Sequence, residues 1–280
     1  MTAPALPVAG RRAALRNVPV YAEIIRGRIR TVVAYRLNLF MALVILVMEI
    51  LILQTVWRAL YGYAGAVDGM TLSAMLGYLT IAGLQHWAMQ DPSMGSYLAQ
   101  RVREGQVSFD LVRPTAYVPQ MLAHLTGSSV AMLMCALVAL PVVAVVGVVR
   151  PPASWTAVAL WLVSLLLGYA VAVLMSLIIG LTAFFTTEIS GVAMLFYLVN
   201  QFFAGAMVPL SVFPGTLRVI AETMPFQATT YTPVSIYMGQ LAGATAGLAM
   251  LRQAVWVLLL SAGVWLLWAR AKRRVVVQGG

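Results

Sequence analysis

Long uninterrupted runs of apolar residues constrain this chain more than any other feature of its sequence. Stretches of about 20 apolar residues, the length that spans a bilayer as a helix, recur along it. They lie near residues 39–57, 71–89, 118–149, 155–185, 191–208 and 248–269. Membrane β-strands would instead appear as shorter, alternating segments. Backbone polar groups in lipid must bond internally, so we expect an all-α integral membrane protein with about six transmembrane helices.

The composition agrees with a chain that is surrounded by lipid. Hydrophobic residues make up 62% of the sequence and charged residues 9%, whereas soluble domains carry about 25% charged residues. The net charge is +10, but the basic residues sit at the ends of apolar runs and form no separate basic domain. We therefore expect the lipid bilayer, and no nucleic acid, as a partner. Cys135 is the only cysteine, which excludes an intrachain disulfide and a cysteine-based metal site.

Four regions follow from the charge and hydropathy pattern. We expect residues 1–17 to be a disordered cytoplasmic tail and residues 18–35 an amphipathic helix in the membrane interface. Residues 36–270 would form the six-helix transmembrane domain, and residues 271–280 a basic cytoplasmic tail. Within the second region Arg28 falls on the apolar face, so its guanidinium should extend along the helix toward water.

Two polar or interrupted segments separate the spans. Between residues 90 and 117 a short charged helix should begin at Asp91-Pro92 and stop at Gly105. Between residues 209 and 240 four prolines divide the apolar residues into pieces too short to span, so we expect broken or re-entrant helices there.

The distribution of basic residues predicts the orientation. With six spans, 14 of the 18 Lys and Arg residues fall on the side that holds both termini and the 90–117 loop. Only Arg58, Arg150, Arg218 and Arg252 fall on the other side. Positive loops stay in the cytoplasm, so we expect a multi-pass protein of the plasma membrane with both termini cytoplasmic.

The sequence contains no recognisable set of catalytic residues. There are two histidines, and the eight acidic residues are scattered over different loops and spans. A P-loop requires lysine after glycine, but the only lysine, Lys272, follows Ala271. We expect no enzyme activity, no metal and no cofactor bound by this chain. If transport is driven by ATP, Mg-ATP must bind to another subunit.

A few polar residues fall inside the predicted spans. A charge at the position of Glu49, in the first span, costs about 2.5–3.5 kcal/mol at the centre of a bilayer, so this side chain should face protein or water. Glu49 is therefore either part of a translocation path or a hydrogen-bonded packing residue. Asn200 and Gln201, in the fifth span, are weaker candidates for the same path, because amides often join helices.

Two stretches resemble a known family. Residues 91–120 (DPSMGSYLAQRVREGQVSFDLVRPTAYVPQ) resemble the cytoplasmic loop of ABC-2 type permeases, in which a charged helix precedes a glycine, a spaced leucine and Arg-Pro. Residues 202–239 (FFAGAMVPLSVFPGTLRVIAETMPFQATTYTPVSIYMG) resemble the last extracytoplasmic segment of that family. The number of spans and the chain length also agree, so the resemblance covers nearly the whole chain.

The resemblance implies an ABC exporter permease that pairs with a second permease, identical or different, and with two cytoplasmic ABC ATPase subunits. The substrate would be a lipid, glycan, drug or antibiotic. The short loop helix would transmit the motion of the ATPase to the spans. The residues expected to couple to the ATPase are Tyr97, Arg101, Arg103, Glu104, Gly105, Asp110, Arg113 and Glu188.

Two other classes of protein remain as alternatives. A secondary transporter should show broken helices in both halves of the chain, whereas here the interruption appears only around residues 209–240. A non-transporting membrane scaffold is the other alternative, and a membrane-embedded enzyme ranks below both.

Overall fold

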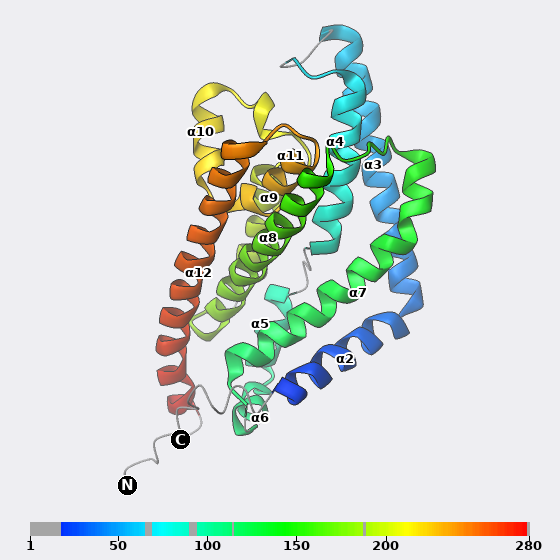
Figure 1. Cartoon of the computed structure of the whole chain (residues 1–280). Helices are drawn as coiled ribbons and strands as arrows, with labels where there is room; N and C mark the ends of the chain where they lie inside the picture. The colour runs from blue at the N-terminus through cyan, green and yellow to red at the C-terminus, as the bar shows by residue number, and fades with distance from the viewer. Residues whose placement is uncertain (1–17, 65–68, 90–93, 114, 187–188, 279–280) are drawn as a thin grey trace.

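The computed structural model describes residues 18–64, 69–89, 94–113, 115–186 and 189–278. In these ranges the chain is helical apart from turns and short connections, which confirms the all-α fold class (Figure 1). The expected tail of residues 1–17 lies outside the described residues. The α-helices are α2 (Val18–Ala34), α3 (Arg36–Ala64), α4 (Leu72–Met89), α5 (Met94–Arg103), α6 (Val107–Val112), α7 (Tyr117–Val146), α8 (Trp155–Leu181), α9 (Ser190–Phe203), α10 (Gly215–Thr223), α11 (Tyr231–Tyr237) and α12 (Gly243–Gln278).

Four helices in the described ranges are long and apolar enough to cross a membrane. They lie within α3, α7, α8 with the 3-10 turn that follows it, and α12. Helices α4 and α9 occupy the places of the second and fifth predicted spans. Helix α4 has 18 residues but carries the polar pair Gln85 and His86 near its end, and α9 has only 14 residues. At 1.5 Å per residue α9 is about 21 Å long, shorter than the apolar thickness of about 30 Å.

Helix α9 ends early because the backbone turns at Gly205. This glycine has φ +78°, a left-handed conformation that interrupts a helix. Its carbonyl accepts a hydrogen bond of 2.8 Å from the hydroxyl of Tyr78, which is completely buried on α4. The break that follows α9 is therefore fixed by a contact with a helix more than a hundred residues earlier in the chain.

Residues 209–240 fold into short pieces, as their prolines predict. The 3-10 turns Leu210–Val212 and Phe226–Ala228 alternate with α10 and α11. Two buried amides hold this segment: Gln85 Nε2 donates to the carbonyl of Thr229 (2.9 Å), and Gln253 Nε2 donates to that of Ala228 (2.8 Å). Irregular backbone at membrane depth needs such partners, and here α4 and α12 supply them.

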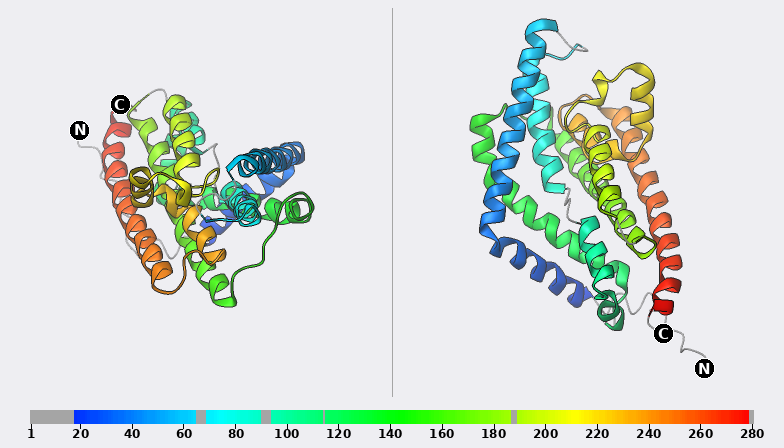
Figure 2. Two further views of the ribbon diagram at one scale, coloured as in Figure 1. Left: turned by 90° about the horizontal axis from the view of Figure 1, so that it is seen from above. Right: turned by 180° about the vertical axis from the view of Figure 1, so that it is seen from behind.

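Helix α2 packs along α7 (Figure 2). A Cβ atom on Gly127 of α7 would lie 2.8 Å from Arg28 Cβ and 2.9 Å from the carbonyl oxygen of Ile25, so the two helices touch closely at this glycine. Arg28 Nε donates to Ser128 Oγ at 2.7 Å. Arg28, which the sequence places on the apolar face, thus has a polar partner on α7, and the absent side chain of Gly127 allows the two helices to come this close.

Different helices form the two ends of the bundle. The α3–α4 hairpin, α10 and α11 lie toward one end, and α5, α6 and the end of α12 lie at the other (Figure 1). At the second end Leu98, Val107 and Ala271 belong to one buried apolar cluster, which joins the short helices to α12.

Candidate functional site

The segment between α4 and α7 forms a compact hairpin of the two short helices α5 and α6. Gly105, with φ +68°, turns the chain between them, as the sequence predicts for the end of a helix. Arg101 and Asp110 close the hairpin through two hydrogen bonds: Nε donates to Oδ2 at 2.7 Å and Nη2 to Oδ1 at 2.8 Å. Their side chains are 20% and 3% exposed. This planar, two-point contact is the strongest geometry available to an arginine and a carboxylate.

The same ion pair changes the proton affinity of the guanidinium. Burial lowers the pKa of Arg101, but the hydrogen bonds and the charge of Asp110 outweigh it, so the net shift in pKa is upward. Arg101 is therefore charged throughout the physiological range, and its charge is satisfied inside the hairpin. A further contact, from Nη1 to Gln106 Oε1 at 3.0 Å, fixes the turn.

Tyr97 attaches the hairpin to α7. Its ring stacks on His124 with centroids 4.2 Å apart and planes inclined by 9°, and the Arg101 guanidinium carbon lies 5.5 Å from the ring centroid. On the same side Gln120 of α7 donates to the carbonyl of Asp110 at 3.2 Å. Tyr97 and Arg101 thus face the interior of the protein, where they position the hairpin.

Leu98 attaches the hairpin to α8. It is fully buried, and a Cβ atom placed on Gly180 of α8 would lie 2.7 Å from Leu98 Cδ2 and 3.0 Å from its Cβ. Leu98 therefore fills the space that a side chain at position 180 would occupy. Any displacement of α5 must move α8 or separate this contact.

The outward side of the hairpin carries both charged and apolar groups. Phe109 and Val112, three residues apart on α6, are 73% and 85% exposed. Arg113, with a side chain 57% exposed, lies at the end of α6, 3.9 Å from Asp110. Glu104 is exposed near the turn and accepts hydrogen bonds from Gln100 (2.7 Å) and Gln106 (2.6 Å). Arg103 is also exposed.

A second polar contact lies inside the spans. Gln201 Nε2 of α9 donates to Glu49 Oε1 of α3 at 3.0 Å. Both side chains are partly exposed, whereas Asn200 is 1% exposed. The structure therefore joins two of the three residues considered for a translocation path and buries the third.

Comparison with known families decides the class of the chain. The family model described as ABC-2 family transporter protein matches residues 43–279. The chain belongs to this ABC-2 transporter family. A comparison with curated proteins found no match. As an ABC-2 permease the chain is a membrane component, and the family implies an ABC ATPase as a separate partner subunit.

Phe109 and Val112 of this ABC-2 permease are exposed on α6 and are not among the coupling residues expected from the sequence. Their spacing of three residues in a short helix, between charged residues and outside the apolar runs, was a usable signal. Asp91 and Pro92, where the short charged helix is predicted to begin, and Glu188, which is expected to couple to the ATPase, lie outside the described residues. Within the described ranges no three His, Cys, Asp or Glu side chains lie together as metal ligands would.

Proposed function

We propose that this chain is the permease subunit of an ATP-driven exporter and that the α5–α6 hairpin couples it to the ATPase. The observation that supports this most strongly is the exposure of Phe109 and Val112 on a short helix outside the apolar spans. Two large apolar side chains on a rigid support, with charges beside them, form the kind of surface that a protein partner covers. The ATPase subunit is the partner that the family implies.

In this proposal the expected coupling residues have two different roles. Arg103, Glu104 and Arg113 provide the charged rim around Phe109 and Val112. Tyr97, Arg101, Gly105 and Asp110 hold the hairpin in shape without contacting the ATPase. Motion of the hairpin then reaches α8 through the contact of Leu98 with Gly180. It reaches α12 through the buried apolar cluster that contains Leu98, Val107 and Ala271.

The same proposal includes the partner subunits, the orientation in the membrane and the translocation path. A second permease, identical or related, completes the translocation path, and Mg-ATP binds on the ATPase subunits. The α5–α6 end and the end of α12 face the cytoplasm of a cell whose plasma membrane the chain spans, and the α3–α4 tip faces outward. Glu49 and Gln201 contribute to the path between the permeases, because a partly exposed carboxylate in a span is better placed against protein or water than against lipid.

Removal of the apolar side chains of α6 tests the docking surface. We expect the double variant Phe109→Ser, Val112→Ser to insert normally but to retain its ATPase at least about tenfold less well, since burial of each such side chain contributes about 1.5–3 kcal/mol. Co-purification of the two subunits from detergent measures this. The matched control is Trp155→Ser, which removes a side chain 89% exposed at the start of α8.

Transport measurements separate the proposal from its alternatives. In vesicles that contain permease and ATPase, export should stop with vanadate and should continue with a proton ionophore. The reverse pattern would identify a secondary transporter. Retention of the ATPase by the double variant at the level of the Trp155→Ser control would contradict the docking surface.

A further inference from the structure

Positive charge is concentrated where the apolar part of α12 ends, at the same end of the bundle as α5 and α6 (Figure 1). The sequence holds no acidic residue after Glu222, and four of the five basic residues beyond it fall between positions 270 and 274. Three of these four side chains lie in the described part of the chain, and all three are exposed. They are Arg270, Lys272 and Arg273, here called the α12 cations. Ala271, between them, is completely buried in the same apolar cluster as Leu98, so this turn of α12 is held in place while its charges face outward.

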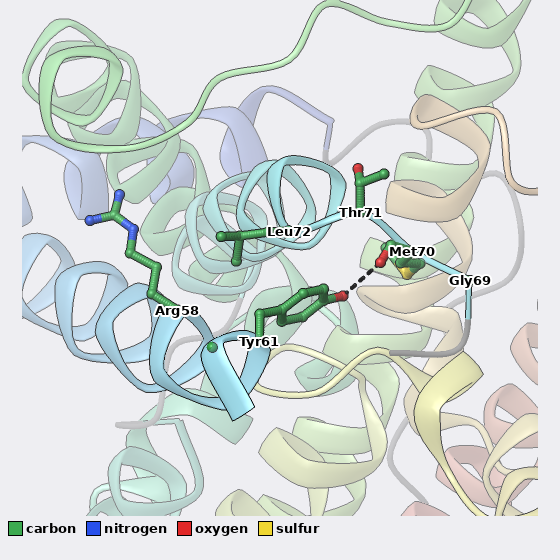
Figure 3. Close-up of a pocket in the computed structure, with 7 residues that line it drawn as sticks. Arg58, Tyr61, Gly69, Met70, Thr71 and Leu72 are labelled. Carbon is green, nitrogen blue, oxygen red and sulfur yellow. Dashed lines mark hydrogen bonds between the residues drawn. The ribbon is translucent and has the colours of Figure 1, made fainter. Parts of the chain in front are cut away.

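Basic side chains at the opposite end of the bundle are bonded to polar groups of the protein. Arg58 lies on the wall of a cavity of about 440 Å³ at the α3–α4 tip (Figure 3), and its Nη2 donates to Gln54 Oε1 at 3.2 Å. Arg218 pairs with Glu222 at 2.8 Å on α10. The α12 cations have no such amide or carboxylate partner among the described residues, so water or a ligand must solvate them.

Acidic residues elsewhere in the sequence are too few to neutralise the α12 cations. Residues 90–117 hold three acidic and three basic residues, so the segment that contains the α5–α6 hairpin is balanced by itself. Glu23 pairs with Arg26 at 2.6 Å on α2. Between residues 114 and 221 the only acidic residue of the sequence is Glu188, which lies outside the described residues. An ion pair with Glu188 would still leave most of the positive charge at the end of α12 in place.

One side of α12 passes from exposed apolar residues to the α12 cations. Leu251, Leu258 and Trp265 are exposed and follow one another at intervals of seven residues, which is close to two helical turns. Lys272 continues this row at the next interval. The apolar members belong to a part of α12 that is long and apolar enough to cross a membrane. A row of this kind is typical of a helix side that faces lipid, with tryptophan at the interface and basic residues beyond it.

The Lys272 ammonium lies at the height expected for lipid headgroups. Headgroups add about 5–7 Å on each side of an apolar layer of about 30 Å. At 1.5 Å per residue, Trp268 lies about 4.5 Å beyond Trp265 along the helix axis. The Lys272 side chain extends back toward the start of α12, so that Nζ lies 5.7 Å from the centroid of the Trp268 ring. With Trp265 at the boundary of the apolar layer, this charge falls within the headgroup layer.

We propose that the end of α12 binds anionic phospholipids of the adjacent leaflet and that the α12 cations hold their headgroup phosphates. Guanidinium forms parallel hydrogen bonds with phosphate oxygens, and an ammonium group adds a point charge. Basic clusters directly after a membrane helix attract anionic lipid, by about fivefold in affinity for each Lys or Arg. The proposal requires neither the ATPase nor transport.

The apolar row on the same side of α12 favours a lipid over the other possible partners. A water-soluble protein could meet the α12 cations but could not cover Leu258 and Trp265, which belong to the span. A second copy of the chain, placed symmetrically against this side, would bring the same positive charges into the contact. An anionic phospholipid has both a negative headgroup and acyl chains, so it matches the cations and the row together.

Quenching of tryptophan fluorescence by brominated lipids measures which lipid lies beside α12. The full-length chain is placed in nanodiscs of phosphatidylcholine that contain a small fraction of brominated phosphatidylglycerol or, in the matched sample, of brominated phosphatidylcholine. The quenching that Trp265→Phe removes reports the lipid at this position. We expect the wild type to prefer phosphatidylglycerol about tenfold or more at low salt. The preference should fall at 1 M salt, where the screening length is about 3 Å instead of about 10 Å at 0.1 M.

Charge variants assign the preference to particular residues. We expect Lys272→Gln, Arg273→Gln to reduce the relative affinity for phosphatidylglycerol by between about fivefold and 25-fold. The exchange Lys272→Arg, Arg273→Lys keeps both charges and should retain the wild-type preference. Arg252→Gln removes an exposed arginine nearer the other end of α12 and should also leave the preference unchanged.

Equal quenching by the two brominated lipids at Trp265 of the wild type would overturn the proposal, and so would an unchanged preference in Lys272→Gln, Arg273→Gln. If this double variant does not insert, the single variant Lys272→Gln keeps the other basic residues of the group. A preference that persists both at 1 M salt and in Lys272→Gln would then overturn it. Weaker retention of the ATPase by the double variant, with the lipid preference unchanged, would assign the α12 cations to a protein partner and overturn it as well.

Discussion

The ion pair between Arg101 and Asp110 should determine how firmly the α5–α6 hairpin stays closed. Hydrogen bonds to charged groups contribute about 1.5–3 kcal/mol each in favourable settings. Asp110 is almost fully buried, but Arg101 is 20% exposed, so solvent screens part of this contribution. For Asp110→Asn we expect a loss of about 2 kcal/mol in the local free energy of opening, which corresponds to a roughly 30-fold change in the opening equilibrium.

Amide hydrogen exchange of the purified protein in a lipid nanodisc measures this opening directly. The amides of α5 and α6 should exchange about 30-fold faster, and so should the amide of Glu104, which follows α5 and donates to the carbonyl of Gln100 at 2.9 Å. Amides in the middle of α8 should not change. This pattern would separate local opening of the hairpin from global destabilisation.

The double variant Arg101→Gln, Asp110→Asn provides the control. Removal of both charges leaves neither one buried without its partner, so this variant should exchange more slowly than Asp110→Asn alone. Exchange in Asp110→Asn within about threefold of the wild type would refute the reasoning, because it would show that the ion pair adds less than about 0.7 kcal/mol.

Three further predictions follow from the same contacts. Gly180→Ala should lower the thermal stability and the transport rate by displacing Leu98. Adding Leu98→Ala to this variant should restore part of the transport. If the double variant recovers no transport, the two residues are not in steric conflict. Gln253→Leu should destabilise the protein by about 1–3 kcal/mol, since it leaves the carbonyl of Ala228 without the amide donor that α12 supplies, and faster exchange around residue 229 would report it. The purified chain alone should hydrolyse no ATP, because its one lysine is not in a P-loop, and hydrolysis in a preparation free of other ATPases would contradict the permease assignment.

The sequence predicted the arrangement of helices well where a single local property decides it. Apolar length predicted α3, α7, α8 and α12, and the glycine after a charged helix predicted the turn at Gly105 that follows α5. It was less successful for α9, whose apolar pattern continues beyond Phe203. The helix ends there because Tyr78, on α4, bonds the backbone at Gly205, and that contact has no local signal.

At the candidate site, too, local sequence predicted some features and tertiary contacts decided the others. The sequence identified the loop that carries the hairpin and most of its charged residues, and it placed Tyr97 and Arg101 among the residues expected to couple to the ATPase. In the structure both side chains face inward, because Asp110 and His124 offer a carboxylate and a ring at the required distances. Phe109 and Val112 took the outward positions in their place.

The sequence by itself determined that the chain is an all-α membrane protein, because the absence of water in a bilayer makes long apolar runs form helices whatever their neighbours are. The tertiary structure alone decided which polar groups face each other: Glu49 and Gln201, Arg28 and Ser128, Arg101 and Asp110. Between helices that are almost uniformly apolar, the relative rotation and height depend on close packing at small residues such as Gly127 and Gly180. That packing is a property of pairs of surfaces, and it cannot be derived from either helix alone.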